Sequence, residues 1–218
     1  MHKELYVSRE NLRDKARGWI ASSYALENRH KIEIPEGKQA LLVVDMQRFF
    51  LEQDSRAFVP AGAEIIDALN KLVKSARKKS VAIFASKHGH LAGDNFPFDH
   101  IWRSLLLKDD PKAEIALDQL KKGDVEIIEK STYSAFQDTE LDGLLKAQNI
   151  KVLVIAGVTS HLCVEATARH AFSLGYFPVI VADCCAAWNE RQQLRTLAAT
   201  IAGFGAISLS EDLFKDLP

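Results

Sequence analysis

From residue 39 onward the chain alternates short apolar runs rich in β-branched residues with longer segments of helical periodicity. Strands buried on both faces of a parallel sheet read as nearly continuous apolar runs, and a crossover segment must join each to the next. The alternation therefore predicts an α/β fold, a doubly wound parallel sheet with helices on both faces. We expect strands at about Ala40–Asp45, Val81–Ser86, Val125–Lys130, Val152–Ala156, Pro178–Ala182 and Ala206–Leu209, and helices at about Ala63–Lys79, Leu141–Ala147, Leu162–Leu174 and Glu190–Ala202.

The sequence divides into an N-terminal arm, residues 1–38, and one domain, residues 39–218. The whole chain is 47% hydrophobic, and the domain is long enough to bury a substantial core. The arm is charged around Ser8–Ile20 and has two open interpretations. It is either solvated or packed on the body or a neighbouring subunit, and an exposed tryptophan would favour packing. The side chains expected to pack are Leu12, Trp19, Ile20, Tyr24 and Leu26.

Charge and cysteine content exclude several classes of function. The net charge is −1 and basic residues are not clustered, so nucleic acid is not an expected partner. No apolar run approaches about 18 residues, and the N-terminus has no secretory pattern, which argues against a membrane partner. Three cysteines, two of them adjacent, give neither a disulfide framework nor a zinc motif. We expect a cytoplasmic protein with reduced thiols.

Three chemically complementary side chains fall at the carboxyl ends of predicted strands. Asp45 ends the first, Lys130 ends the third, and Cys163 follows the fourth through a turn at Gly157. Ligands of open parallel sheets bind at this edge. Singly, each residue also has a structural interpretation: a turn cap, a solvated lysine or a small buried thiol. Together they predict a reactive site.

These residues could hydrolyse an amide through a thioester. Cys163 is predicted at the first turn of a helix, where the dipole would depress its pKa. Asp45 would act as proton acceptor and donor, while Lys130 would hold it ionised and favour the thiolate. The backbone N–H groups of Thr159 and Cys163 are the candidates for the oxyanion hole.

Three separated blocks resemble the isochorismatase-like cysteine hydrolases: Leu41–Phe50 around Asp45, Lys130–Leu141, and Gly157–Ala168 around Cys163. The resemblance covers about residues 38–210. It implies that Asp45, Lys130 and Cys163 form a catalytic triad, and that the fold is the Rossmann-like isochorismatase fold with six parallel strands in the order 3-2-1-4-5-6. It also implies a homodimer or homotetramer and a cis peptide between Val158 and Thr159.

Within this family the cysteine favours the amidohydrolase branch, of the N-carbamoylsarcosine amidase, nicotinamidase and ureidoacrylate amidohydrolase types. True isochorismatases cleave a vinyl ether and typically lack a cysteine at this position. The alternatives are an isochorismatase-type vinyl ether hydrolase, supported weakly by the segment 23–30, and a non-catalytic binding relative. The expected substrate is a small amide, carbamoyl or ureido compound.

We expect no metal and no other cofactor. Nicotinamidases place an Asp-x-His pair after the first strand, but the corresponding segment Phe49–Phe58 contains no histidine. The remaining candidate is the pair His88 and His90, which has no evident third ligand.

Residues near the predicted strand ends are candidates for the substrate pocket. Aromatic walls suit a small flat amide. Two of the candidates, Phe49 and Phe136, have core packing as an equal alternative, and His161 is a lesser candidate for a base. Specificity is expected from loops such as His88–Pro111. The pocket candidates are Gln47, Phe49, His88, Tyr133, Phe136, His161 and Trp188.

The implied strand order sets a test for the triad. Lys130 would end an edge strand two places from Asp45, and strands lie about 4.8 Å apart, so the two backbones would be roughly 10 Å from each other. A lysine side chain covers much of that distance. We therefore expect the ammonium to reach both Asp45 and Cys163.

Overall fold

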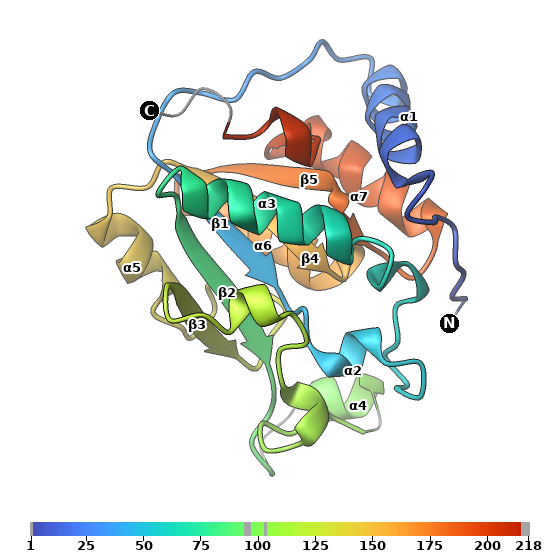
Figure 1. Cartoon of the computed structure of the whole chain (residues 1–218), viewed down its shortest axis with the longest axis vertical. Coiled ribbons are helices and arrows are strands. Elements are labelled where there is room, and N and C mark those ends of the chain that lie inside the picture. The colour runs from blue at the N-terminus through green and yellow to red at the C-terminus, as the bar shows by residue number, and fades with distance from the viewer. Residues whose placement is uncertain (1, 94–96, 103, 215–218) are drawn as a thin grey trace.

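The computed structural model describes residues 2–93, 97–102 and 104–214. Its centre is a six-stranded sheet in the order β3-β2-β1-β4-β5-β6, in which every neighbouring pair is parallel (Figure 1). The predicted sheet and its order are confirmed. The strands are β1 Gln39–Val44, β2 Ala82–His88, β3 Val125–Lys130, β4 Val152–Val158, β5 Phe177–Ala186 and β6 Ala206–Ser208.

Helices cover both faces of the sheet. In Figure 1, α3 crosses in front of the strands and α6 lies behind them. The sequence of α3 explains why it lies on the sheet. One side of the helix is a buried apolar stripe and the opposite side is polar; the buried residues are Leu69, Leu72, Val73 and Ala76. The helices are α1 Leu12–Leu26, α2 Arg48–Leu51, α3 Ile66–Lys78, α4 Phe98–Trp102, α5 Leu141–Ala147, α6 Glu165–Ser173 and α7 Glu190–Gly203, with 3-10 turns at Pro60–Gly62, Pro111–Ala113, Asp118–Leu120 and Ser210–Asp212.

The central strands form the core. Every residue of β4 is buried, and β4 pairs with β1 on one side and β5 on the other. This position explains why its sequence is continuously apolar. Both β4 and β5 extend beyond the predicted ends, to Val158 and Ala186, because their pairing resumes after an irregularity between Ile155 and Gly157.

The connection after β4 differs from the prediction. A helix was expected from Leu162, but the segment Ser160–Val164 is a π-helical turn, and α6 begins only at Glu165. Such turns are rare and recur at functional sites.

The N-terminal arm packs on the body, so its interpretation as a solvated segment is wrong. Helix α1 contacts α7 and β5, and the side chain of Trp19 is buried and donates a hydrogen bond from Nε1 to Glu190 at 2.8 Å. Leu12 is also buried, whereas Leu26 is 75% exposed and does not pack as expected. The Tyr6 hydroxyl accepts a hydrogen bond from the amide of Ala187 at 3.0 Å.

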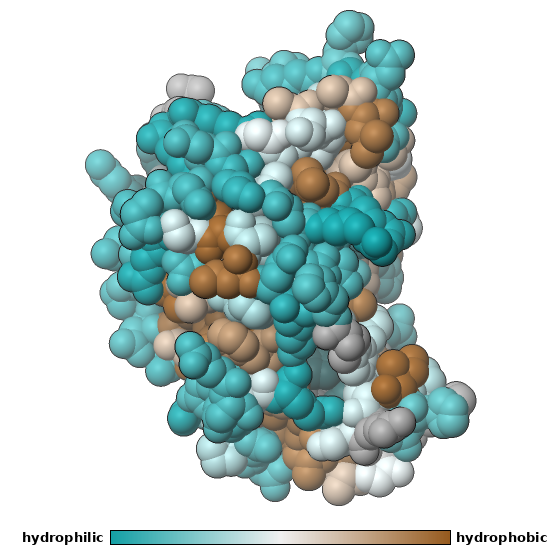
Figure 2. Space-filling model, turned by 90° about the vertical axis from the view of Figure 1, so that its right-hand side faces the viewer, coloured by the Kyte–Doolittle hydropathy of each residue, from teal (hydrophilic) through white to brown (hydrophobic). Residues whose placement is uncertain are grey.

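The surface on the side of α1 is mostly hydrophilic, and its hydrophobic residues form separate small groups (Figure 2). Within the described ranges, no helix combines the length and apolar character needed to cross a bilayer. Residues 94–96 and 103 of the expected specificity loop, residue 1 of the arm and residues 215–218 of the domain lie outside the described residues.

Candidate active site

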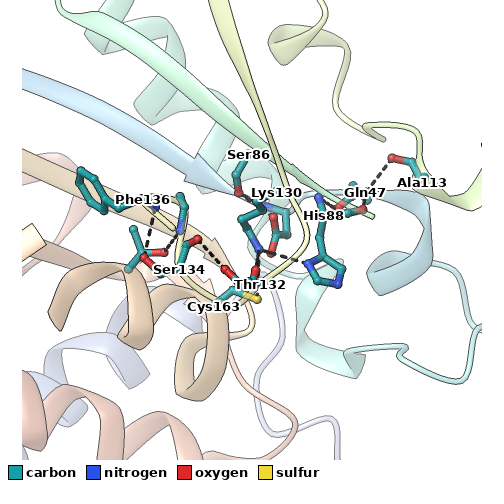
Figure 3. A network of polar contacts seen from close by, with 12 residues as sticks. Gln47, Ser86, His88, Ala113, Lys130, Thr132, Ser134, Phe136 and Cys163 are labelled. Carbon is teal, nitrogen blue, oxygen red and sulfur yellow. Dashed lines mark hydrogen bonds and ion pairs between the residues drawn. The ribbon is translucent and has the colours of Figure 1, made fainter. Parts of the chain in front are cut away.

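Asp45, Lys130 and Cys163 meet at the carboxyl edge of the sheet. Figure 3 shows the side chains of Lys130 and Cys163 pointing toward one another there. The Nζ atom of Lys130 lies 2.7 Å from Asp45 Oδ2 and 3.5 Å from Cys163 Sγ. Lys130 ends β3 and Asp45 follows β1, so the lysine side chain spans the width of β2 to reach them. The ammonium of Lys130 therefore reaches the Asp45 carboxylate, as a triad of these residues requires.

Ser86, near the end of β2, holds the Asp45 carboxylate by hydrogen bonds. Its hydroxyl donates to Asp45 Oδ1 at 2.6 Å and accepts from the Asp45 amide at 3.2 Å. Asp45 is fully buried and has a φ of 50°, which is uncommon for a residue other than glycine. Sequence reasoning missed Ser86, although its place at the end of the neighbouring strand was a usable signal.

Lys130 carries the positive charge of the site. Burial alone would lower its pKa, but the Asp45 carboxylate and the Cys163 sulfur outweigh burial and raise the pKa above its ordinary value. The ammonium therefore stays charged, and it also donates to the carbonyl oxygen of Thr132 at 3.0 Å. A buried charge with these partners is held in one position.

The expectation of a depressed pKa for Cys163 is wrong. The cysteine is 5% exposed, and burial raises the pKa of its thiol. The Asp45 carboxylate adds to this effect, while the Lys130 ammonium opposes it. The resting cysteine is therefore a thiol, and it needs a base at the moment of attack.

Gly157 allows β1 and β4 to approach closely just before the site. Its φ is 116°, and a Cβ there would lie 2.7 Å from the amide nitrogen of Val44 and closer still to its carbonyl oxygen. Only glycine fits this position. The next peptide bond, between Val158 and Thr159, is cis.

His88 and His90 form a neutral pair beside the lysine. Burial and the Lys130 charge lower the pKa of His88 to about 3, so its ring is neutral, and its Nδ1 lies 3.5 Å from Lys130 Nζ. The Nε2 atoms of the two histidines are 3.1 Å apart. The described part of the chain brings no third histidine, cysteine or carboxylate into a group that could hold a metal. The donors here do not fit a metal centre.

A cavity of about 510 Å³ opens onto the cysteine. This volume suits a small-molecule ligand. Four of the predicted pocket residues lie on its wall: Phe49, His88, Tyr133 and Trp188. Thr159 and Cys163, the candidates for the oxyanion hole, lie there too. The remaining described wall residues are Phe50, Arg56, Ala57, His90, Phe98, Ile101, Trp102, Leu105, Leu106 and Leu162.

Three predicted pocket residues lie elsewhere. The Gln47 side chain is fully buried and ties loops together, donating to the carbonyl oxygens of His88 at 2.8 Å and Ala113 at 2.7 Å. Phe136 stacks on Tyr176, with ring centroids 5.8 Å apart, and belongs to the core. His161 packs against Trp188 at 4.8 Å rather than lining the cavity. Proximity in sequence to a strand end does not fix the direction of a side chain.

Residues 39–212 match the family model of the isochorismatase domain, and the chain belongs to the isochorismatase family. It is 30% identical to nicotinamidase 3 of Arabidopsis thaliana over 91% of this chain and 98% of the relative. It is also 30% identical to the ureidoacrylate amidohydrolase RutB of Yersinia enterocolitica, over 70% and 76% of the two chains.

Among solved structures, N-carbamoylsarcosine amidase from Thermoplasma acidophilum is similar, with a TM-score of 0.71 and 26% identity over 80% of this chain and 97% of the other. The family and fold implied by the sequence resemblance are both confirmed.

Proposed function

We propose that this protein is a cysteine amidohydrolase that cleaves a C–N bond of a small amide, carbamoyl or ureido compound. The observation that carries the proposal is the contact of Lys130 Nζ with both Asp45, at 2.7 Å, and Cys163, at 3.5 Å, together with the position of Cys163 on the wall of a cavity. The names of the similar proteins support amide chemistry, because each acts on an amide or ureido compound.

The first half-reaction forms a thioester. Asp45 accepts the thiol proton as Cys163 Sγ attacks the carbonyl carbon, and it then delivers that proton to the nitrogen as the C–N bond breaks. In the second half, Asp45 takes a proton from water, whose oxygen attacks the thioester carbonyl. The acid product leaves and the proton returns to the sulfur.

Lys130 assists because it contacts both ends of the proton transfer. When the proton moves from Cys163 to Asp45, the negative charge moves from the carboxylate to the sulfur. Both atoms lie within 3.5 Å of the ammonium, so the positive charge is never left without a partner. This lowers the cost of forming the thiolate in a buried site.

We assign the oxyanion hole to the backbone N–H groups of Thr159 and Cys163. Both residues lie on the cavity wall, and Thr159 follows the extended end of β4. Backbone donors fixed in this way stabilise a developing negative charge without reorganisation.

Ammonia release from a panel of small amides and ureas tests the proposal, with isochorismate included for the vinyl ether alternative. Cys163→Ala should abolish release from every amide that the wild type hydrolyses, while Cys184→Ala, a change at a thiol outside the cavity wall, should retain it. Turnover of isochorismate alone would favour the vinyl ether hydrolase, and no turnover with any compound would favour the non-catalytic binding relative.

Further expectations concern the chain as a whole. The three cysteines are free, which supports a cytoplasmic location. The division into an arm, residues 1–38, and a domain, residues 39–218, and the homodimer or homotetramer remain part of the proposal. Light scattering of the purified protein tests the oligomeric state.

A further inference from the structure

One permanent charge lies among the described residues of the cavity wall. Among its described residues Arg56 is the cation, and no aspartate or glutamate is present. The two histidines do not add charge, because burial lowers the pKa of both. The remaining wall is largely apolar and aromatic. The described part of the wall therefore carries positive charge and no negative charge, which favours a ligand of negative charge.

Arg56 has donors to spare. Its Nη1 donates to the carbonyl oxygen of Trp102 at 2.6 Å, and its guanidinium carbon lies 5.6 Å from the ring centroid of Phe49. These neighbours hold the group at the wall without neutralising it. No described carboxylate forms an ion pair with Arg56. A guanidinium has five N–H groups, so most remain available.

A second cation comes from the N-terminal arm. Lys3 Nζ donates to the carbonyl oxygen of Arg56 at 2.6 Å and lies 5.4 Å from the ring centroid of Trp188, another wall residue. The described residues give it no carboxylate partner either. Burial, and then the charge of Arg56, lower the pKa of Lys3. Two like charges thus lie close to one another, Arg56 on the cavity wall and Lys3 against two wall residues, an arrangement that a bound anion would stabilise.

We propose that Arg56 and Lys3 form an anion subsite, and that the substrate is an amide or ureido compound with a carboxylate at the end remote from the scissile bond. The proposal rests on the function proposed above, since Cys163 would attack the amide end. The carboxylate would reach the cations at the rim, and the aromatic walls between them would contact the connecting atoms. A bidentate contact suits Arg56 and a single contact suits Lys3.

The test compares two ureas that differ in charge, 3-ureidopropionate and propylurea. Their binding to Cys163→Ala protein is measured by isothermal titration calorimetry, so the readout does not depend on turnover. We expect the carboxylate to improve affinity about 10- to 100-fold, as for charge-assisted hydrogen bonds, and added salt to reduce this advantage. Adding Arg56→Gln should remove most of the difference between the two ureas, and Lys3→Gln should remove a smaller part.

The controls separate charge from folding. Arg56→Lys should retain part of the preference, and Lys112→Gln, a cation paired with Asp54 outside the cavity wall, should retain all of it. Equal affinity of the two ureas for Cys163→Ala protein would overturn the subsite, as would a preference that survives both Arg56→Gln and Lys3→Gln. Hydrolysis of neutral amides without a carboxylate preference would overturn the subsite alone, whereas preferential binding without any turnover would leave the subsite and overturn the amidohydrolase.

Discussion

Replacing Lys130 with methionine removes the positive charge from a position where both partners of an ion pair have no exposed side-chain surface. The Asp45 carboxylate would then be buried without its counter-charge, which typically costs about 3–5 kcal/mol of folding free energy. The carbonyl oxygen of Thr132 would also lose its donor, adding about 1 kcal/mol. We expect Lys130→Met to lower the free energy of unfolding by about 4–6 kcal/mol.

The chain offers a control pair at the same distance. Lys146 Nζ lies 2.7 Å from Asp142 Oδ2, but these side chains are 63% and 30% exposed. Because water screens such a pair and solvates whatever remains, Lys146→Met should cost under about 1 kcal/mol. The comparison separates burial from distance.

A double-mutant cycle isolates the coupling. In the variant with both Asp45→Asn and Lys130→Met no uncompensated charge remains, so its stability should exceed the additive expectation by more than about 2 kcal/mol. All variants of the cycle should lose amide hydrolysis, because each lacks part of the proposed triad. Stability and activity would thus respond differently to the second substitution.

Urea unfolding followed by tryptophan fluorescence at pH 8 measures the cycle. The pH matters because Lys130 helps to lower the pKa of His88, and without the lysine His88 could take up a proton in acid and replace the missing charge. The reasoning is refuted if Lys130→Met costs no more than Lys146→Met, or if the two substitutions of the cycle are additive.

Three further predictions concern the same edge of the sheet. Gly157→Ala should destabilise the protein by more than about 2 kcal/mol, because the added Cβ would overlap the Val44 backbone. Thermal unfolding measures the effect, with Gly123→Ala, at an open position, as the control. Equal effects of the two substitutions would contradict the prediction. Burial lowers the pKa of His88 to about 3, so between pH 7 and 5 protons bind mainly to the unfolded chain. The free energy of unfolding should therefore be about 2 kcal/mol lower at pH 5 than at pH 7. Urea unfolding at both pH values measures this difference, and His88→Asn should lack the part that comes from His88. Iodoacetamide should label Cys163 before the other two cysteines, at a rate that rises with pH because burial raises the pKa of the thiol; mass spectrometry showing equal rates would exclude selective access.

The fold was predictable because its determinants are local and repeated. Continuous apolar runs such as β4 fit only strands covered on both faces, and stripes such as that of α3 fit only amphipathic helices. The strand order came from the family resemblance. The π-helical turn Ser160–Val164 was not predictable, because the periodicities of π and α turns are indistinguishable over five residues.

The convergence of Asp45, Lys130 and Cys163 could be inferred from strand ends, since parallel strands end at one edge. The direction of the Cys163 pKa shift could not, because it depends on how much surface the folded chain covers. The sequence also did not reveal that Gln47 and Phe136 lie away from the cavity, because that depends on the direction of their side chains.

Arg56 lies outside the helices and strands and Lys3 lies in the arm, so no periodic pattern in the sequence pointed to either residue.

The contact of Lys3 with the backbone of Arg56 has an evolutionary consequence. The matched family domain begins at residue 39, so Lys3, one of the two cations of the proposed anion subsite, belongs to a segment that precedes it. Substrate selectivity could then change during evolution by replacement of the N-terminal arm, while the proposed triad stays the same. A chimera in which the N-terminal arm of a relative replaces that of this protein would show whether the arm determines the preference among amide substrates.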